Sequence, residues 1–297
     1  MELIQVIKNT WSFNDLKHIK DYPVWGDRIV SLYHTDQGPY ILKGLPLSTE
    51  PSLLANNLRA QEALSDHDLA PEIIKTNQGQ LYIKTDHHYL FLMAYLDGEN
   101  LQANGEDEYK LGQATRRLHS QVVIDHASNL YSLDRLNTYK SWFEDQAFKP
   151  AYDVILEDLP DFNQTQQAFI HTDIGPHNAK FNSQGQVYFI DLDDAGMGPL
   201  YLDLGWPFIM QFVDYNKANG QMTYQLEAAL GFLRGYYMDQ AIPEDQYKLI
   251  WQGATYMHVS YMKTYGPEAV EALWKILQYG LDQKDLVFRA YHQAIKL

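Results

Sequence analysis

A polar loop that leads into a short hairpin constrains this chain more than any other feature. Residues 171–178 read H-T-D-I-G-P-H-N, and residues 179–190 place two short apolar stretches around the turn N-S-Q-G. This pattern predicts a β-hairpin. Asp173 and Asn178 lie on the loop before the hairpin, and Asp191 directly follows its second strand. We therefore expect two carboxylates and one amide to flank a single hairpin.

These side chains suit phosphoryl transfer. The transferred group carries negative charge, so the protein must fix Mg²⁺ near it. Asn178 and Asp191 offer the oxygen ligands that Mg²⁺ prefers, and Asp193 is a further candidate ligand. We predict that Asp173 is the base that accepts the proton of the attacking hydroxyl, and that His171 holds the geometry of the loop. Asp173, Asn178 and His171 form the predicted catalytic group.

The first part of the chain reads as strands with one helix. A turn at Asp36-Gln37-Gly38 joins the first two apolar stretches into a predicted hairpin, and a proline starts the helix. The expected strands and the helix lie at 28–33, 39–44, 81–84, 89–93 and, for the helix, 51–65.

Beyond Gly98 the periodicity becomes helical. The expected helices lie at 106–120, 137–147, 162–169, 202–215, 222–240, 244–265 and 267–294. Strands first and helices later predict an α+β fold with two lobes. We expect the boundary at 94–99, with residues 1–95 as a β-rich domain and 96–297 as a helical domain.

Composition is that of a globular protein. The chain has 297 residues, of which 45% are hydrophobic and 21% charged, and it has no cysteine. Disulfides, thiol catalysis and cysteine metal sites are therefore excluded. Since no apolar run reaches the length of a membrane span and Met1–Gln5 lacks the basic start of a signal peptide, we expect a cytoplasmic protein without membrane contact.

The net charge of −15 argues against nucleic acid as a partner, because phosphates require basic patches. Residues 1–97 hold 12 acidic and 8 basic side chains, and residues 98–297 hold 26 and 15. An acidic cleft would suit a cationic substrate. An acidic surface that serves only solubility is the alternative.

Several motifs together resemble the aminoglycoside phosphotransferase and choline kinase-like family, including its spore-coat-kinase-like branch. The resemblance spans nearly the whole chain. It rests on Y-I-L-K at 40–43, L-M-A-Y-L-D-G-E at 92–99, L-H-S at 118–120, the 171–178 loop, and I-D-L-D-D-A at 190–195 with Gly198-Pro199 and Asp203-Leu204.

The resemblance implies a protein-kinase-like fold that transfers the γ-phosphoryl group of ATP to a hydroxyl of a small molecule. By this resemblance, Lys43 contacts the α- and β-phosphates, and Glu62 is its candidate partner. Met93 and Tyr95 belong to the hinge whose backbone binds adenine. The phosphate loop departs from the protein-kinase pattern, since Gly26 is its one glycine within 21–27.

The resemblance also covers the second part of the chain. It implies that Asp173 is the catalytic base, that Asn178 and Asp191 bind Mg²⁺, and that Asp203 is a buried carboxylate bracing the catalytic loop. Only 13 residues run from Asp191 to Asp203, which is too short for a peptide-docking loop and favours a small acceptor over a protein substrate.

Other readings stay open. The single-glycine phosphate loop leaves room for a catalytically weak or silent kinase-fold protein with a coat or binding role. A metal-dependent hydrolase could use His171, Asp173 and His177 as ligands. Aromatic side chains of the helical part could surround an ammonium group or simply fill the core. Six such residues are Trp142, Trp206, Trp251, Trp274, Tyr256 and Tyr261. The sequence predicts neither the acceptor nor the oligomeric state.

Overall fold

The computed structural model describes residues 3–24, 26–121, 138–265 and 267–296. These residues fall into two compact units. The first holds the described residues up to Glu99 together with Phe181–Asp193, and the second holds the described residues from Asn100 to Lys180 and from Asp194 onwards. The hairpin's second strand and Asp191 therefore belong with the N-terminal part of the chain.

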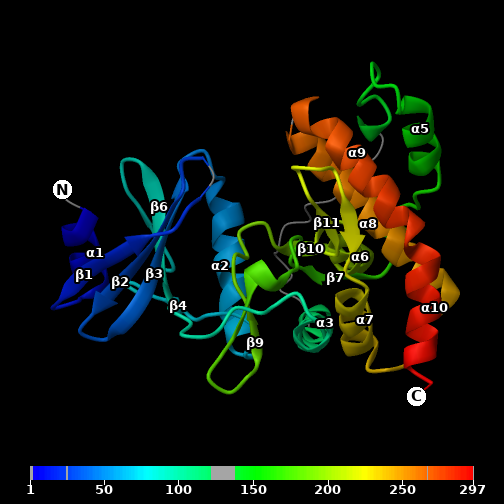
Figure 1. Ribbon diagram of the computed structural model, residues 1–297. Helices are drawn as coiled ribbons and strands as arrows, with labels where there is room; N and C mark the ends of the chain where they lie inside the picture. Colours follow the sequence, from blue (N-terminus) through cyan, green and yellow to red (C-terminus); the bar gives the residue numbers. More distant parts are fainter. Residues whose placement is uncertain (1–2, 25, 122–137, 266, 297) are drawn as a thin grey trace. The chain divides into compact units, whose positions relative to one another are not determined.

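The first unit is an antiparallel sheet with one helix on each face (Figure 1). The strand order is β1-β2-β3-β6-β4, and β5 also pairs with β6. The strands are β1 Leu16–Asp21, β2 Ile29–Thr35, β3 Gly38–Pro46, β4 Ile73–Ile74, β5 Ile83–Lys84 and β6 His88–Ala94, and the helices are α1 Leu3–Trp11 and α2 Pro51–Ser65.

Alternation along β3 sorts its side chains between the two faces of the sheet. Ile41 and Leu45 pack with Leu54 and Leu58 of α2 in one apolar cluster. Leu42 packs with the opposite cluster, which includes Ile7 and Trp11 of α1. Lys43, two residues after Ile41, therefore lies on the face that α2 covers, and it is only 6% exposed.

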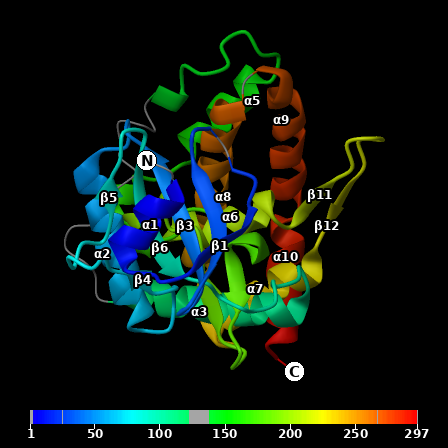
Figure 2. The same cartoon turned by 90° about the vertical axis from the view of Figure 1, so that its left-hand side faces the viewer.

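The second unit consists mainly of helices. Its helices are α3 Gly105–Ser120, α5 Lys149–Glu157, α6 Leu200–Met210, α7 Leu226–Tyr237, α8 Glu244–Tyr265, α9 Pro267–Asp282 and α10 Lys284–Ala294, with 3₁₀ turns at Phe162–Gln164 and Pro176–Asn178. Its paired strands are β7 Gln167–Ile170 with β10 Gly196–Pro199 and β11 Val213–Tyr215 with β12 Met222–Tyr224. The β11–β12 hairpin extends beside α9 (Figure 2).

Helices α6 and α8 pack with their backbones in contact, because glycines stand at the crossing. A Cβ atom on Gly205 would lie 2.2 Å from the backbone nitrogen of Ala254, and one on Gly253 would lie 1.9 Å from the carbonyl oxygen of Tyr201. Close packing at Gly205 fixes the turn of α6 that carries Asp203.

Most expected elements are confirmed, and the α+β division into a sheet-containing part and a helical part is correct. The expected hairpin after the polar loop is formed by β8 Ala179–Phe181 and β9 Val187–Phe189. Helix α2 covers the expected 51–65 and α8 the expected 244–265. Within the described residues, no helix is both long and apolar enough to cross a membrane.

Several expected helices are wrong. Residues 162–169 form a 3₁₀ turn and most of β7. In the helix expected at 137–147, residue 137 lies outside the described part, and 140–147 form turns with one unassigned residue. The helices expected at 202–215 and 222–240 are present but shorter, as α6 and α7, because β11 replaces the end of the first and β12 the start of the second. Two elements near the N-terminus, α1 and β1, and the helix α5 were not predicted.

Candidate active site

The polar loop of the second unit begins where β7 ends, and a buried carboxylate holds it there. Asp203 is 0% exposed. Its two oxygens accept backbone hydrogen bonds from His171 (2.7 Å) and Thr172 (2.6 Å). Thr172 has a φ of 77°, which is unfavourable for a β-branched residue and is held only where the surroundings require it. Asp203 thus fixes the backbone immediately before Asp173.

A histidine on α3 completes this brace. His119 Nε2 lies 3.1 Å from Asp203 Oδ2, and His119 Nδ1 lies 3.0 Å from the hydroxyl of Tyr236 on α7. His119 is 9% exposed. One carboxylate, held by an imidazole, therefore ties α3 and α6 to the loop. The sequence assigned no role to His119 beyond its place in the L-H-S motif.

Asp173 is partly exposed and is oriented by two neighbours. Asn178 Nδ2 donates to Asp173 Oδ2 (2.8 Å) and to the backbone oxygen of Asp173 (3.0 Å), and His177 Nε2 lies 3.2 Å from Asp173 Oδ2. Burial on its own would raise the pKa of Asp173. Three neighbours outweigh the effect of burial and hold the pKa of Asp173 below its usual value. They are His177, through its hydrogen bond and its charge, His171, through its charge, and Asn178, through its hydrogen bond. Asp173 is therefore ionised at neutral pH.

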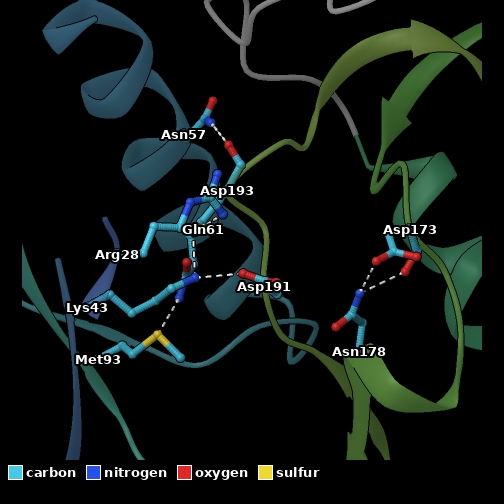
Figure 3. A network of polar contacts seen from close by, with 9 residues as sticks. All are labelled: Arg28, Lys43, Asn57, Gln61, Met93, Asp173, Asn178, Asp191 and Asp193. Atoms are coloured by element: carbon cyan, nitrogen blue, oxygen red, sulfur yellow. Dashed lines mark hydrogen bonds and ion pairs between the residues drawn. The ribbon is translucent and has the colours of Figure 1, made fainter. Parts of the chain in front are cut away.

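Asn178 presents its amide nitrogen to Asp173, and its amide oxygen points the other way (Figure 3). This oxygen is the atom that a hard cation would bind. Asn178 is 7% exposed and lies at the end of the 3₁₀ turn that precedes β8. The spacing of five residues between Asp173 and Asn178 thus forms one hydrogen-bonded turn.

The first unit gathers a second set of charged side chains (Figure 3). Lys43 Nζ lies 2.8 Å from Asp191 Oδ1 and 2.6 Å from Asp193 Oδ1. Burial on its own would lower the pKa of Lys43, but the charges of Asp193 and Asp191 and their hydrogen bonds outweigh it and raise that pKa. Lys43 is therefore a permanent cation between two carboxylates.

Two residues that sequence reasoning missed also hold this segment. Asn57 of α2 donates from Nδ2 to the backbone oxygen of Asp193 (2.7 Å). Arg28, just before β2, brings Nη1 to 3.6 Å from Asp193 Oδ2. Neither stood in a recognisable motif. Their partner is 136 residues from Asn57 in sequence, so local pattern carries no signal for the contact.

The partner expected for Lys43 is not the one found. Glu62 pairs with Lys75 (2.9 Å) and lies outside the Lys43 cluster, so the pairing of Glu62 with Lys43 is wrong. Gln61, the residue before Glu62, lies on the inward face of α2 and is 7% exposed. Its side chain donates a hydrogen bond to the backbone oxygen of Pro71. The helical period explains the difference, because adjacent positions on a helix point about 100° apart.

The remaining expected nucleotide residues lie in the first unit. Met93 is still within β6, where it pairs with β3 and β4, and the strand ends at Ala94. The expected hinge therefore leaves the sheet only from Tyr95 onwards. Gly26 has a φ of 66° in the loop before β2, and residue 25 of that loop lies outside the described residues.

A cavity of about 470 Å³ lies in the second unit. Thr172, which precedes Asp173, is one of its lining residues, and so is Asp194. Three of the six aromatic residues singled out in the sequence also line it, namely Trp142, Trp206 and Tyr261. The other three, Trp251, Trp274 and Tyr256, are buried in the core. Burial raises the pKa of Tyr261 most, followed by the hydrogen bond and charge of Tyr265. The charge of Asp173 raises it further.

The described part of the chain holds no metal-binding group of the hydrolase type. Among the residues that the structure describes, no group of three or more His, Asp or Glu side chains is gathered as a metal site. His177 instead contacts Asp173, and His171 is buried at 1% exposure. The loop thus has the arrangement of an oriented carboxylate and lacks that of a histidine metal centre.

The second unit carries a braced loop with an oriented carboxylate, and the first unit carries a lysine between two carboxylates. These are the features of kinase-like phosphotransferases. The sequence comparison agrees, since residues 23–243 match the phosphotransferase enzyme family. The chain belongs to that family. A search of curated protein sequences finds no significant match.

Solved structures with the same fold include several small-molecule kinases. The amicoumacin kinase hAmiN, solved with AMP-PNP, Ca²⁺ and Ami, has a TM-score of 0.65 at 15% identity over 95% of this chain and 92% of its own. A microcompartment-associated aminopropanol kinase has a TM-score of 0.65 at 14% identity, covering 98% and 97%. A choline kinase from Cryptosporidium parvum Iowa II has 0.59 at 13%, covering 99% and 96%. At these identities the likeness concerns the fold.

Proposed function

We propose that this protein transfers the γ-phosphoryl group of ATP, with Mg²⁺, to a hydroxyl of a small molecule. The observation that carries the proposal is the geometry of Asp173. It is ionised, partly exposed and oriented by Asn178 and His177, on a backbone that Asp203 holds in a strained conformation. A general base needs this combination of access, charge and fixed direction.

The chemistry of the first unit fits a nucleotide with its metal. Asp191 and Asp193 offer hard oxygen ligands, and Lys43 offers a permanent positive charge beside them. We assign Asp191, Asp193 and the amide oxygen of Asn178 to Mg²⁺, and Lys43 to the phosphates. Bound Mg²⁺ supplies neutralisation of the phosphate charge. The match to a fold solved with AMP-PNP and Ca²⁺ supports a nucleotide as donor.

In this proposal, each side chain has one task. Asp173 accepts the proton of the acceptor hydroxyl, and Asn178 and His177 keep its carboxylate in the direction of that proton. Asp203 and His119 hold the loop so that Asp173 needs no rearrangement during the reaction. We assign the donor to residues 1–95 with the returning segment 181–193, and the acceptor to the helical part of 96–297.

The cavity beside Thr172 is the proposed acceptor site. Its volume of about 470 Å³ falls in the range of small-molecule sites. Asp194, Trp206 and Tyr261 give it the means to hold an ammonium group by charge and by aromatic faces. Lys263 lies over the ring of Trp142, 5.1 Å from its centroid, so that ring already carries a cation. A cationic acceptor would therefore contact the Trp206 and Tyr261 side.

The test is acceptor-dependent release of ADP. Wild-type protein with Mg-ATP would be screened against aminoalcohols, aminoglycosides, macrolides, homoserine, thiamine and ribose derivatives. We expect at least one alcohol to raise ADP release, and the same alcohol to have no effect on Asp173→Asn. Release that persists in Asp173→Asn would refute the assignment of the base.

A catalytically silent kinase-fold protein is the second candidate. The observation that favours it is the phosphate loop, where Gly26 is the single glycine. Such a protein would show a rise in melting temperature with Mg-ATP, since a ligand that binds the native state stabilises it. It would release no ADP with any acceptor. Turnover by the wild type would exclude this candidate.

A further inference from the structure

Two cations, and not one, face the carboxylate of Asp193 in the first unit (Figure 3). Lys43 Nζ lies 2.6 Å from Oδ1, and Arg28 Nη1 lies 3.6 Å from Oδ2. The Asp193 side chain is 11% exposed and that of Arg28 is 38% exposed. The lysine contact is a hydrogen-bonded ion pair, whereas the arginine contact is longer than a hydrogen bond.

The Arg28 contact does not satisfy the oxygen that it faces. Asp193 Oδ2 is buried and has no hydrogen-bond donor among the described residues. Asn57 fixes the backbone of Asp193, so the carboxylate keeps its position without Arg28. A guanidinium placed at this distance, on a partly exposed side chain, is available to another anion.

Arg28 also stands at the phosphate loop. It follows Gly26 and Asp27 and leads directly into β2. A loop rich in glycine brings backbone amides close to phosphates, and the 21–27 loop has a single glycine with which to do so. A guanidinium presents several N–H donors in a planar fork that matches phosphate oxygens. Arg28 therefore has both the place and the chemistry to replace missing amides.

We propose that Arg28 is a second phosphate ligand of the nucleotide site, acting with Lys43 in place of a glycine-rich loop. This inference rests on the proposed function. In the structure, the charges of Arg28 and Lys43 balance those of Asp191 and Asp193. When the two carboxylates bind a divalent cation, both basic side chains lose their partners, and the phosphates of the nucleotide take their place.

This exchange separates the proposal from a simple brace. If Arg28 only anchored Asp193, its loss would weaken Mg-ATP through the metal site, and a higher Mg²⁺ concentration would restore the affinity. As a phosphate ligand, Arg28 contributes to binding of ATP and ADP but not of adenosine. Its contribution also falls with salt, because contacts to phosphate are ionic.

The experiment compares Arg28→Gln, Arg28→Ala, Arg28→Lys and a matched control, Arg59→Gln. Arg59 is an exposed arginine of the same unit, on α2, and its guanidinium contacts Asn56. Calorimetric titration measures Kd for ATP and ADP at low and at saturating Mg²⁺, and ligand-observed NMR measures adenosine. Melting temperatures without ligand report on folding.

We expect Arg28→Gln to weaken Mg-ATP about tenfold, the loss of one charge-assisted contact, and to leave adenosine unchanged. Arg28→Lys should lose less, since it keeps the charge without the fork. Arg59→Gln should match the wild type. Unchanged Mg-ATP affinity in Arg28→Gln, or in Arg28→Ala should Gln fail to fold, would overturn the inference.

Equal weakening of Mg-ATP and adenosine would also overturn it, because the effect would then not depend on phosphate. Recovery of wild-type affinity in Arg28→Gln at saturating Mg²⁺ would overturn it as well, because the effect would then act through the metal site. Failure of the proposed function has a different signature. Wild-type protein that bound no nucleotide with Mg²⁺ would refute both the function and the phosphate role. Wild-type protein that bound Mg-ATP with the same affinity as Arg28→Gln would refute only the role of Arg28.

Discussion

Replacing Asp203 by Asn should separate the position of the catalytic loop from nucleotide binding. Asp203 is fully buried and accepts the backbone N–H groups of His171 and Thr172 on different oxygens. Asparagine has nearly the same size but only one acceptor oxygen, and its NH₂ group would face an N–H donor. His119, which also contacts the carboxylate, would lose its charged partner.

The magnitude follows from these contacts. One buried N–H left without an acceptor costs about 1–3 kcal/mol, and the other bonds lose their charge-assisted character. We therefore expect Asp203→Asn to lower the free energy of unfolding by about 3 kcal/mol. Thr172, no longer held at a φ of 77°, would relax, and a shift of Asp173 by about 1 Å lowers kcat by about 100-fold.

Urea denaturation and steady-state kinetics measure the two effects, with Asp282→Asn as the control. Asp282 is an exposed aspartate at the end of α9. We expect the control to match the wild type in both assays. Since Lys43, Asp191 and Asp193 lie in the first unit and only Asn178 of the proposed metal ligands lies on the loop, Kd for Mg-ATP should change much less than kcat in Asp203→Asn. Wild-type kcat in folded Asp203→Asn would refute the role of Asp203 in placing Asp173.

Three further predictions concern the metal, pH and the acceptor. Asp191→Asn should lose Mg²⁺-dependent nucleotide binding and Asp173→Asn should retain it, as measured by calorimetric titration; equal loss in both would contradict their separate roles. Burial raises the pKa of Glu108 from 4.5 to about 8, so the folded state holds an extra proton between these values and stability falls as pH rises through that window. Glu108→Gln should remove up to about 5 kcal/mol of that decline in the free energy of unfolding, measured by urea denaturation at about pH 5 and about pH 8. A variant with the same pH dependence as the wild type would contradict the burial of Glu108. If the acceptor is cationic, its kcat/KM should fall as salt rises, whereas a salt-independent kcat/KM would argue for a neutral acceptor.

The sequence predicted those elements whose pattern is local. Helix α2 begins at Pro51 after an N-terminal cap by Glu50, whose side chain accepts from the backbone of Ser52 and Leu53. The polar loop and its hairpin were likewise predicted, because their turn and apolar stretches are contiguous. Within the loop, the contact of Asn178 with Asp173 follows from a spacing of five residues.

The sequence could not predict elements that depend on distant partners. Strand β7 forms where a helix was expected, because Gln167–Ile170 pairs with Gly196–Pro199. Lys43 pairs with Asp191 and Asp193, about 150 residues away, and not with Glu62 of α2. Glu62 is excluded by a one-residue difference on α2, since the inward position is that of Gln61. The contact of Asn57 with Asp193 depends likewise on the fold, since no local pattern joins residues 136 positions apart.

The most direct test of the central claim is transfer of the γ-phosphoryl group followed by ³¹P NMR. Wild-type protein and Asp173→Asn would each be incubated with Mg-ATP and the alcohol that gives the strongest ADP release. We predict signals of ADP and of a new phosphate monoester with the wild type, and unchanged Mg-ATP with Asp173→Asn, which still binds the nucleotide. A phosphate monoester formed at the same rate by Asp173→Asn, or inorganic phosphate as the only product of the wild type, would contradict the claim.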